Sequence, residues 1–191
     1  MSTALSKGEQ TRADIVDCAQ KLFYEHGYDG TSFSDIVDAS GLVRGNIYHY
    51  FKTKDDILKA VVEQHLKDFS ALLARWEQES DDPKVRLMAF IDMVTGRKND
   101  LVKYGCPIGT LNTELAKDRR DLQQGARALF DLFRNWLAAR FKEMGKTADA
   151  DALALHLLGR AQGVAVIAHI YRDAKLLQQE TRLLREWVQL L

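Results

Sequence analysis

The amino-acid sequence predicts an all-α protein, and three observations support that class. Only two prolines, Pro83 and Pro107, occur in 191 residues, so most of the chain has no residue that breaks a helix. Apolar residues recur at spacings of three and four along most of the length, which is the pattern of helices with one buried face. The composition, 46% hydrophobic and 28% charged residues, is that of an ordinary globular chain and excludes disordered and fibrous classes. We expect about nine helices.

The first fifty residues predict three helices, with a tight turn between the second and the third. The apolar stripe of the first helix is Ile15, Cys18, Ala19, Leu22 and Phe23. Gly27 ends that helix, and Ser32 and Asp35 have the spacing of a capping box that starts a short second helix. A third short helix over residues 43–50 follows closely after Gly41. This order matches a helix-turn-helix, in which the later helix enters the major groove of DNA.

Six further helices are expected, at residues 53–78, 83–97, 111–116, 120–145, 149–172 and 174–191. Thr53 and Asp56 repeat the capping-box spacing, and Pro83 stands at a favoured first helical position. Several glycines and Pro107 interrupt the pattern between residues 96 and 109, where we expect irregular chain. The sequence therefore divides into a helix-turn-helix domain over residues 1–54 and a larger helical domain over residues 55–191.

The segment 149–172 is apolar almost all round, which has two explanations. One is a membrane span, but the segment contains charged and polar residues and no basic clusters flank it. The other is a helix buried by a second copy of the chain, and Gly159 and Gly163, four apart, would allow close helix approach. We favour the second explanation and expect a homodimer through residues 149–172 and 174–191, with no membrane partner.

Charge and cysteine usage restrict the remaining possibilities. Lys plus Arg and Asp plus Glu both number 27, so any nucleic-acid site must be local. Cys18 and Cys106 lie far apart and the first ten residues lack the apolar core of a signal peptide, so we expect a reducing cytoplasm. The five histidines show no metal-ligand spacing, and we expect neither a metal nor a cofactor.

The sequence around the predicted turn resembles a known family. The motifs are Gly27-Tyr28-Asp29-Gly30-Thr31-Ser32, Ile36-Val37, Ser40-Gly41-Leu42-Val43, Gly45-Asn46-Ile47-Tyr48-His49-Tyr50-Phe51 and Lys52-Thr53-Lys54-Asp55-Asp56-Ile57-Leu58. Together they resemble the amino-terminal domain of the TetR family of bacterial regulators over roughly residues 11–58. The resemblance implies a DNA-binding first domain. It also implies a second domain that binds a small molecule and dimerises through its last two long helices.

The predicted third helix carries a local positive charge. Residues 1–54 hold six basic and seven acidic residues, yet between Ala39 and Lys54 the only charges are Arg44, Lys52 and Lys54. Arg44 can form a bidentate contact with guanine, and Asn46 can read a base edge. We expect DNA contacts from Ser32, Ser34, Arg44, Gly45, Asn46, Tyr48, His49 and Lys54.

Several of these residues have a structural alternative. Ser32 is first a helix cap, and the role of Ser34 at the phosphate backbone is implied only by the resemblance. Tyr48, Tyr50 and Phe51 are alternatively packing residues between the third and fourth helices, and Lys52 is alternatively a solvated side chain. The family usually has Thr where Asn46 stands, which leaves the base preference open.

Apolar and polar residues of the second domain are candidates for a ligand pocket, because small-molecule sites combine apolar walls with a few polar groups. The expected lining residues are Phe69, Met88, Tyr104, Phe133, Trp136, His156 and Gln162. For each aromatic residue and Met88, ordinary core packing is the alternative. Cys106 precedes a predicted helix, which would favour the thiolate that senses oxidants or electrophiles; a small buried side chain is the alternative.

Two other functional classes are weighed against a DNA-binding regulator. An enzyme is disfavoured because the chain has no GxSxG, glycine-rich phosphate loop, HExxH or CxxC motif. A protein-binding adaptor is disfavoured by the acid-free stretch from Arg44 to Lys54. Specific, salt-sensitive retention on DNA separates a regulator from an adaptor. We therefore expect a repressor that binds a palindromic operator as a dimer and is released by a small apolar or amphipathic ligand.

Overall fold

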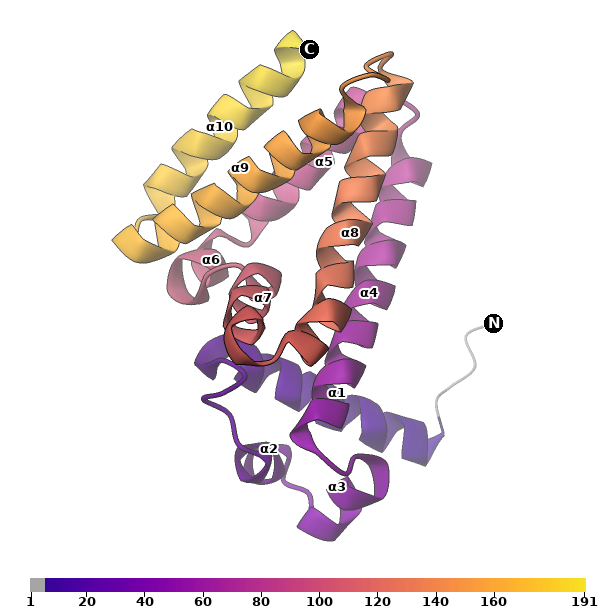
Figure 1. Ribbon diagram of the computed structural model, residues 1–191, viewed down its shortest axis with the longest axis vertical. Coiled ribbons are helices and arrows are strands. Elements are labelled where there is room, and N and C mark those ends of the chain that lie inside the picture. The colour runs from indigo at the N-terminus through magenta and orange to yellow at the C-terminus, as the bar shows by residue number, and fades with distance from the viewer. Residues whose placement is uncertain (1–5) are drawn as a thin grey trace. The chain divides into compact units, whose positions relative to one another are not determined.

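A computed structural model describes residues 6–191, and within that range the chain is helical with no β-strand (Figure 1). The predicted all-α class is confirmed. The ten helices of this range are α1 (Lys7–His26), α2 (Phe33–Ser40), α3 (Arg44–Tyr50), α4 (Lys54–Glu79), α5 (Pro83–Gly96), α6 (Lys98–Tyr104), α7 (Pro107–Asp118), α8 (Arg120–Glu143), α9 (Ala150–Tyr171) and α10 (Ala174–Leu190). Residues 1–5, which the expected first domain includes, lie outside the described residues.

The chain forms two compact units, and the first is discontinuous in sequence. It comprises the residues up to His65 together with Leu111–Arg127, and the second comprises Leu66–Thr110 and Ala128–Leu191. Helices α4, α7 and α8 therefore each have residues in both units. These units are defined by contacts within the fold and do not test where the DNA-binding domain ends. The boundary after residue 54 therefore stays a prediction.

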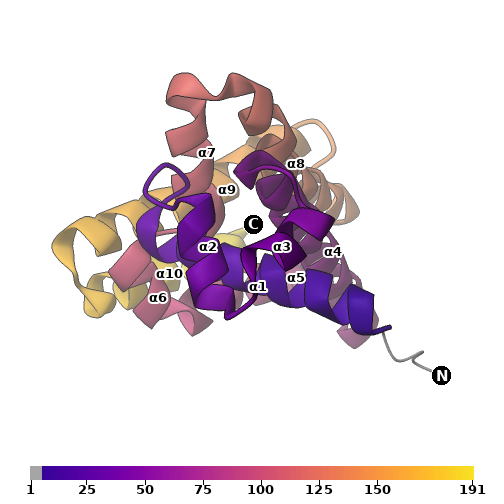
Figure 2. The ribbon, with the colours of Figure 1, turned by 90° about the horizontal axis from the view of Figure 1, so that it is seen from below.

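The first unit begins with α1, α2 and α3, which local signals in the sequence define (Figure 2). A capping box at Ser6 and Glu9 starts α1, and the predicted capping box at Ser32 and Asp35 starts α2. Gly41, with a φ of 66°, ends α2 in the left-handed conformation that favours glycine. The buried side chains between these helices are Ile15, Val16, Ala19, Phe23, Ile36, Ile47 and Phe51.

Three side chains join distant parts of the first unit. Tyr28, only 1% exposed, donates its phenolic hydrogen to Asp55 at the start of α4. Arg119, between α7 and α8, donates to the same carboxylate, with 2.5 Å from Nη2 to Oδ2 of Asp55. The hydrogen bond from Arg119 is the main cause that holds the pKa of Asp55 below its usual 3.8. Burial, reinforced by the hydrogen bond to Asp55, raises the pKa of Tyr28.

The turn between α1 and α2 is held by two further side chains of the first unit. The carboxylate of Glu114 in α7 accepts hydrogen bonds from the backbone amides of Tyr28 and Asp29, at 3.0 and 2.8 Å. The ammonium group of Lys54 donates to the carbonyl oxygens of Tyr28 and Thr31, at 2.7 and 2.9 Å. Donors and acceptors of this turn are thus satisfied from α7 and from α4.

The second unit packs α5, α6, α9 and α10 together, and α9 lies beside α10 along its length (Figure 1). One apolar cluster of this unit consists of Leu101, Val164, Ala165, Ala168 and Leu177. Leu101 belongs to α6, so the prediction of irregular chain between residues 96 and 109 is wrong. The helix is only seven residues long and ends at Gly105, whose φ is 81°, and Pro107 then takes the first position of α7.

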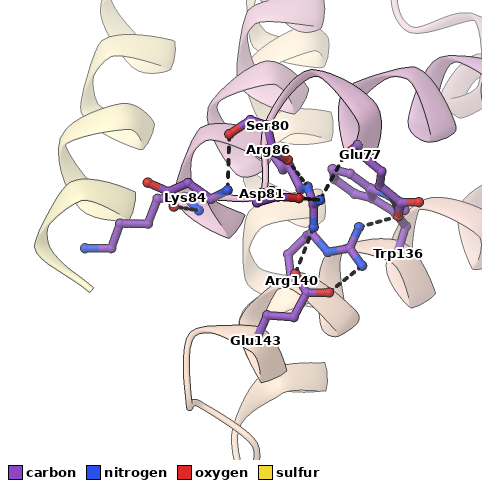
Figure 3. Close-up of polar contacts among 9 residues, drawn as sticks. Glu77, Ser80, Asp81, Lys84, Arg86, Trp136, Arg140 and Glu143 are labelled. Atoms are coloured by element: carbon purple, nitrogen blue, oxygen red, sulfur yellow. Dashed lines mark hydrogen bonds and ion pairs between the residues drawn. The ribbon is translucent and has the colours of Figure 1, made fainter.

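A polar cluster joins the carboxyl ends of α4 and α8 in the second unit (Figure 3). The guanidinium group of Arg140 donates to Glu77 and, at 2.7 Å, to Glu143. Trp136 also donates from Nε1 to Glu77, at 2.8 Å, and Arg86 donates to both the backbone of Glu77 and the carboxylate of Glu143. The hydrogen bond from Arg140 chiefly lowers the pKa of Glu77.

Among the helices that the structure describes, α9 alone is long and apolar enough to cross a membrane by length and composition. The same test is passed by core helices of globular proteins. One side of α9 packs in this unit through residues such as Leu157, Val164 and Ala168, while Leu155, Val166, Ile167 and Ile170 are exposed.

The Asp55 network predicts a specific acid sensitivity. A carboxyl group whose pKa is depressed in the folded state contributes stability above its unfolded pKa and loses it as the pH falls through the folded pKa. The Tm of the unmodified chain should therefore exceed that of Asp55→Asn at pH 7, by a few °C, and the difference should shrink between about pH 5 and pH 2. Thermal unfolding followed by circular dichroism measures both.

Asp17→Asn is the control, because Asp17 is an exposed carboxylate of α1 in the same unit. If Asp55→Asn and Asp17→Asn give the same dependence of Tm on pH, the network contributes nothing to stability.

Candidate functional site

Helix α3 presents nearly all of its polar residues to solvent and anchors itself by a single buried residue. Ile47 is 0% exposed, whereas Arg44, Gly45, Asn46 and His49 are exposed. A Cβ added at Gly45 would meet no atom within 4 Å, so the helix has open space on that side. An anchored helix with an exposed polar face has the form needed to enter a DNA groove.

Two aromatic rings hold the side chain of Arg44. The rings of Phe33 in α2 and Tyr48 in α3 stack with centroids 4.8 Å apart. The guanidinium carbon of Arg44 lies 6.0 Å from the Phe33 centroid and 5.8 Å from that of Tyr48, within the range of cation–π attraction. Nη2 of Arg44 also donates to the hydroxyl of Ser34, at 3.4 Å. Tyr48 and Ser34, both sequence candidates, thus lie around the strongest candidate, Arg44.

The two lysines that follow α3, Lys52 and Lys54, make hydrogen bonds within the protein. Lys52 donates to the carbonyl oxygen of Tyr48. Lys54 makes the two hydrogen bonds to the turn after α1, and its Nζ lies 4.0 Å from the centroid of the Tyr28 ring. These bonds use two of the three hydrogens of the Lys54 ammonium group. We assign Lys54 first to the turn, and a phosphate contact of Lys54 stays a prediction.

Several remaining residues near α3 also make contacts within the protein. The hydroxyl and the amide of Ser32 both take part in its capping box with Asp35, so Ser32 acts as a helix cap. The hydrogen bond from the Ser32 amide is the main cause of a lowered pKa at Asp35. Phe51 is 4% exposed and packs in the core, and the ring of His49 meets that of Tyr50 edge-on at 5.1 Å. Contacts of Ser32 and His49 with DNA stay predictions.

The second unit contains a cavity that is open to solvent, and its empty space, including that solvent, amounts to about 520 Å³. Its walls come from α4 to α9 and are mainly apolar. The lining residues are Phe69, Phe90, Met93, Val94, Arg97, Leu101, Cys106, Pro107, Ile108, Phe133, Leu158, Ala161, Gln162 and Ala165. Three of the expected pocket residues, Phe69, Phe133 and Gln162, therefore lie around one cavity, and the rings of Phe69 and Phe133 are 5.0 Å apart.

The other four expected pocket residues are not part of this lining. Trp136 belongs to the polar cluster with Glu77, and Met88 lies 4.0 Å from Nη1 of Arg185. The ring of Tyr104 faces Lys103. His156 is exposed and its ring lies 4.8 Å from that of Trp187, so it needs no buried polar partner. Sequence reasoning missed Phe90 and Arg97, and no local pattern marks either of them as a lining residue.

Cys106 and Gln162 lie on the same stretch of the cavity wall. A Cβ added at Gly109 would lie 2.4 Å from Oε1 of Gln162 and 3.6 Å from Sγ of Cys106. Gly109 thus leaves the space that the carboxamide of Gln162 occupies. The thiol of Cys106 is half-buried and directly precedes α7. A redox role of Cys106 stays a prediction.

Comparison with known families identifies the chain. Residues 15–61 match the model of the tetR family of bacterial regulatory proteins. Residues 83–182 match the model of the carboxy-terminal domain of LmrA/YxaF-like transcriptional regulators. The chain belongs to the TetR family of bacterial transcriptional regulators, as its sequence motifs predicted.

Individual relatives agree with this assignment. An uncharacterized HTH-type regulator from the lacX 3' region of Lactococcus lactis is 26% identical over 179 residues, 92% of this chain and 91% of the relative. The repressor ComR of Escherichia coli is 38% identical over 60 residues, 31% of this chain and 29% of ComR. A TetR regulator from Chloroflexus aurantiacus has a similar structure, with a TM-score of 0.84, 27% identity and 97% of each chain covered.

Proposed function

We propose that this regulator is a cytoplasmic repressor that binds a near-palindromic DNA operator as a homodimer and is released by a small amphipathic ligand. The observation that carries the proposal is the surface of α3, where Arg44 is exposed, held by two aromatic rings and free of neighbouring acids along the chain from Ala39 to Lys54. A repressor role is supported by ComR, a relative that is named a repressor.

Sequence reading is assigned to Arg44 and Asn46. Both are exposed at the amino-terminal end of α3, which is the end that contacts base edges in helix-turn-helix proteins. Arg44 is suited to O6 and N7 of guanine and Asn46 to adenine. Ser34, Tyr48 and His49 are assigned to the phosphate backbone, since hydroxyl and imidazole groups commonly donate there.

A dimer is supported by the exposed apolar surface of the last two helices. Its exposed apolar residues are Leu155, Val166, Ile167, Ile170, Tyr171, Leu183 and Leu190. A groove of about 590 Å³ runs beside them, lined by Gly159, Arg160, Gly163, Val164, Ile167, Leu176 and Glu180. Neither glycine has an atom within 4 Å of an added Cβ, so a second helix can approach closely here.

Ligand control is supported by the cavity and by the helices that line it. Mainly apolar walls that include Arg97 and Gln162 suit an apolar body that carries one polar group. Helix α4 carries Phe69 on the cavity and begins at Lys54, directly after the segment that reads DNA. A ligand changes DNA affinity only if it binds one arrangement of the two α3 helices more tightly than the other.

The first test concerns sequence reading. Duplexes are selected from a random pool with the unmodified chain, and their affinities are measured for variants. Arg44→Ala and Asn46→Ala should each weaken binding to the selected duplex by about 1 to 3 kcal/mol, because each removes a contact with a base edge. Arg75→Ala, which removes an exposed positive charge from the second unit, is the matched control. Unchanged binding in both α3 variants contradicts the assignment of α3.

The second test concerns the dimer. Gly163→Leu should shift the chain from dimer to monomer in sedimentation equilibrium at micromolar concentration, because a leucine side chain separates the two copies of α9. Gly125→Leu is the control, since Gly125 is equally open and lies on α8. A stable monomer of the unmodified chain is the result that refutes the proposal.

The third test concerns ligand control. Small amphipathic molecules are screened for those that raise the Tm, and each is then tested for its effect on operator affinity. We expect release of DNA with a coupling of about 1 to 3 kcal/mol. Phe133→Trp should mimic or block these molecules by filling the cavity. If molecules that raise the Tm leave operator affinity unchanged, the cavity does not regulate DNA binding.

A further inference from the structure

The residue before Arg44 is unusual for its position. Val43 is the N-cap of α3, and no side-chain hydrogen bond caps this helix. Ser, Thr, Asp and Asn are favoured at an N-cap because their oxygen accepts from a free amide, and valine has no such atom. Helices α1 and α2 of the same unit both begin with a serine cap that makes this bond.

Packing of the Val43 side chain does not offset the missing cap, because this side chain is 74% exposed. Within the described residues of the first unit, Val43 and Tyr48 are the exposed large hydrophobic side chains, and Tyr48 has a role at Arg44. A residue that is unfavourable for its helix position and gains no stability from packing marks a candidate functional position.

The neighbouring residues indicate which function. Val43 adjoins Arg44, whose guanidinium group is held by Phe33 and Tyr48. Under the proposed function the amino-terminal end of α3 contacts base edges, and Val43 is exposed at that end next to Arg44. The only apolar group on those edges is the 5-methyl group of thymine.

We propose that Val43 reads the 5-methyl group of a thymine in the same half-site as the base read by Arg44. This inference rests on the proposed function, since it assigns one base of the operator that α3 reads. The valine excludes water from the methyl group, and the helix gives up its N-cap hydrogen bond for that contact.

The test replaces each thymine of a selected duplex in turn by deoxyuridine, which lacks only the 5-methyl group. For the unmodified chain, one position in each half-site should lose about fourfold in affinity, the equivalent of the ~0.8 kcal/mol for one buried methylene-sized group. For Val43→Ser, the same replacement should change affinity by less than about 1.5-fold, because the apolar contact is absent.

The same variant gives a second, independent readout. Serine restores the N-cap hydrogen bond, so Val43→Ser should raise the Tm by about 2 to 4 °C while it lowers affinity for the thymine duplex. Val43→Ala keeps an uncapped helix, and its shorter side chain should weaken the methyl dependence without the gain in Tm. Val85→Ala, at an exposed valine of α5, is the matched control and should keep the full response to deoxyuridine.

The outcomes separate the two levels of the proposal. If no duplex is enriched from the random pool, the proposed function is wrong and this inference with it. If a duplex is enriched and Arg44→Ala weakens it, but deoxyuridine affects Val43→Ser and the unmodified chain equally, operator binding stands and the role of Val43 is overturned.

Discussion

The ion pair between Asp55 and Arg119 is the interaction on which the first unit depends. The two residues are 64 positions apart, and their contact brings the corner between α7 and α8 into the same unit as α1, α2 and α3. Tyr28 completes the group from the turn after α1. Both charged side chains are about one third exposed, so the hydrogen-bond geometry matters more here than the bare charge attraction. The contact thus joins residues 111–127 to α1, α2 and α3 within one unit.

In the first unit, different residues stabilise the fold and form the exposed surface of α3. Lys54, Glu114 and the Asp55 group satisfy the backbone of the turn between α1 and α2, and Ile47 anchors α3 in the core. The exposed residues of α3, such as Asn46 and His49, therefore do not need to pack in the core. The rings of Phe33 and Tyr48 flank the guanidinium group of Arg44, and under the proposed function this contact would lower the entropy that Arg44 loses on binding a base.

Local signals in the sequence predicted most of the helices, whereas contacts between distant segments could not be predicted from it. The capping box at Ser32 and the proline at residue 83 each act within one turn of helix, so their positions are readable from the sequence. Helix α6 was missed because seven residues between two glycines show no periodic stripe. Arg119 and Glu114 gave no local sign of contacting Asp55 and Tyr28.

The candidate site was predictable to a similar extent. Residues of α3 follow from one motif, and the structure adds which of them are exposed and which are used internally. The cavity draws residues from six helices, so its membership depends on packing that no periodicity encodes. His156 illustrates the difficulty, because an apolar helix looks the same in sequence whether its outer face meets a core or lies exposed.

The ratio of affinities for a selected duplex and for a scrambled duplex of equal composition tests the central claim most directly. Both affinities are measured by fluorescence anisotropy at physiological salt concentration with the full chain. If α3 reads sequence as a dimer, the ratio should reach about 10³ or more, and a scrambled duplex should bind only through phosphate contacts. A ratio near one would contradict the account, because the protein would then bind DNA without reading it.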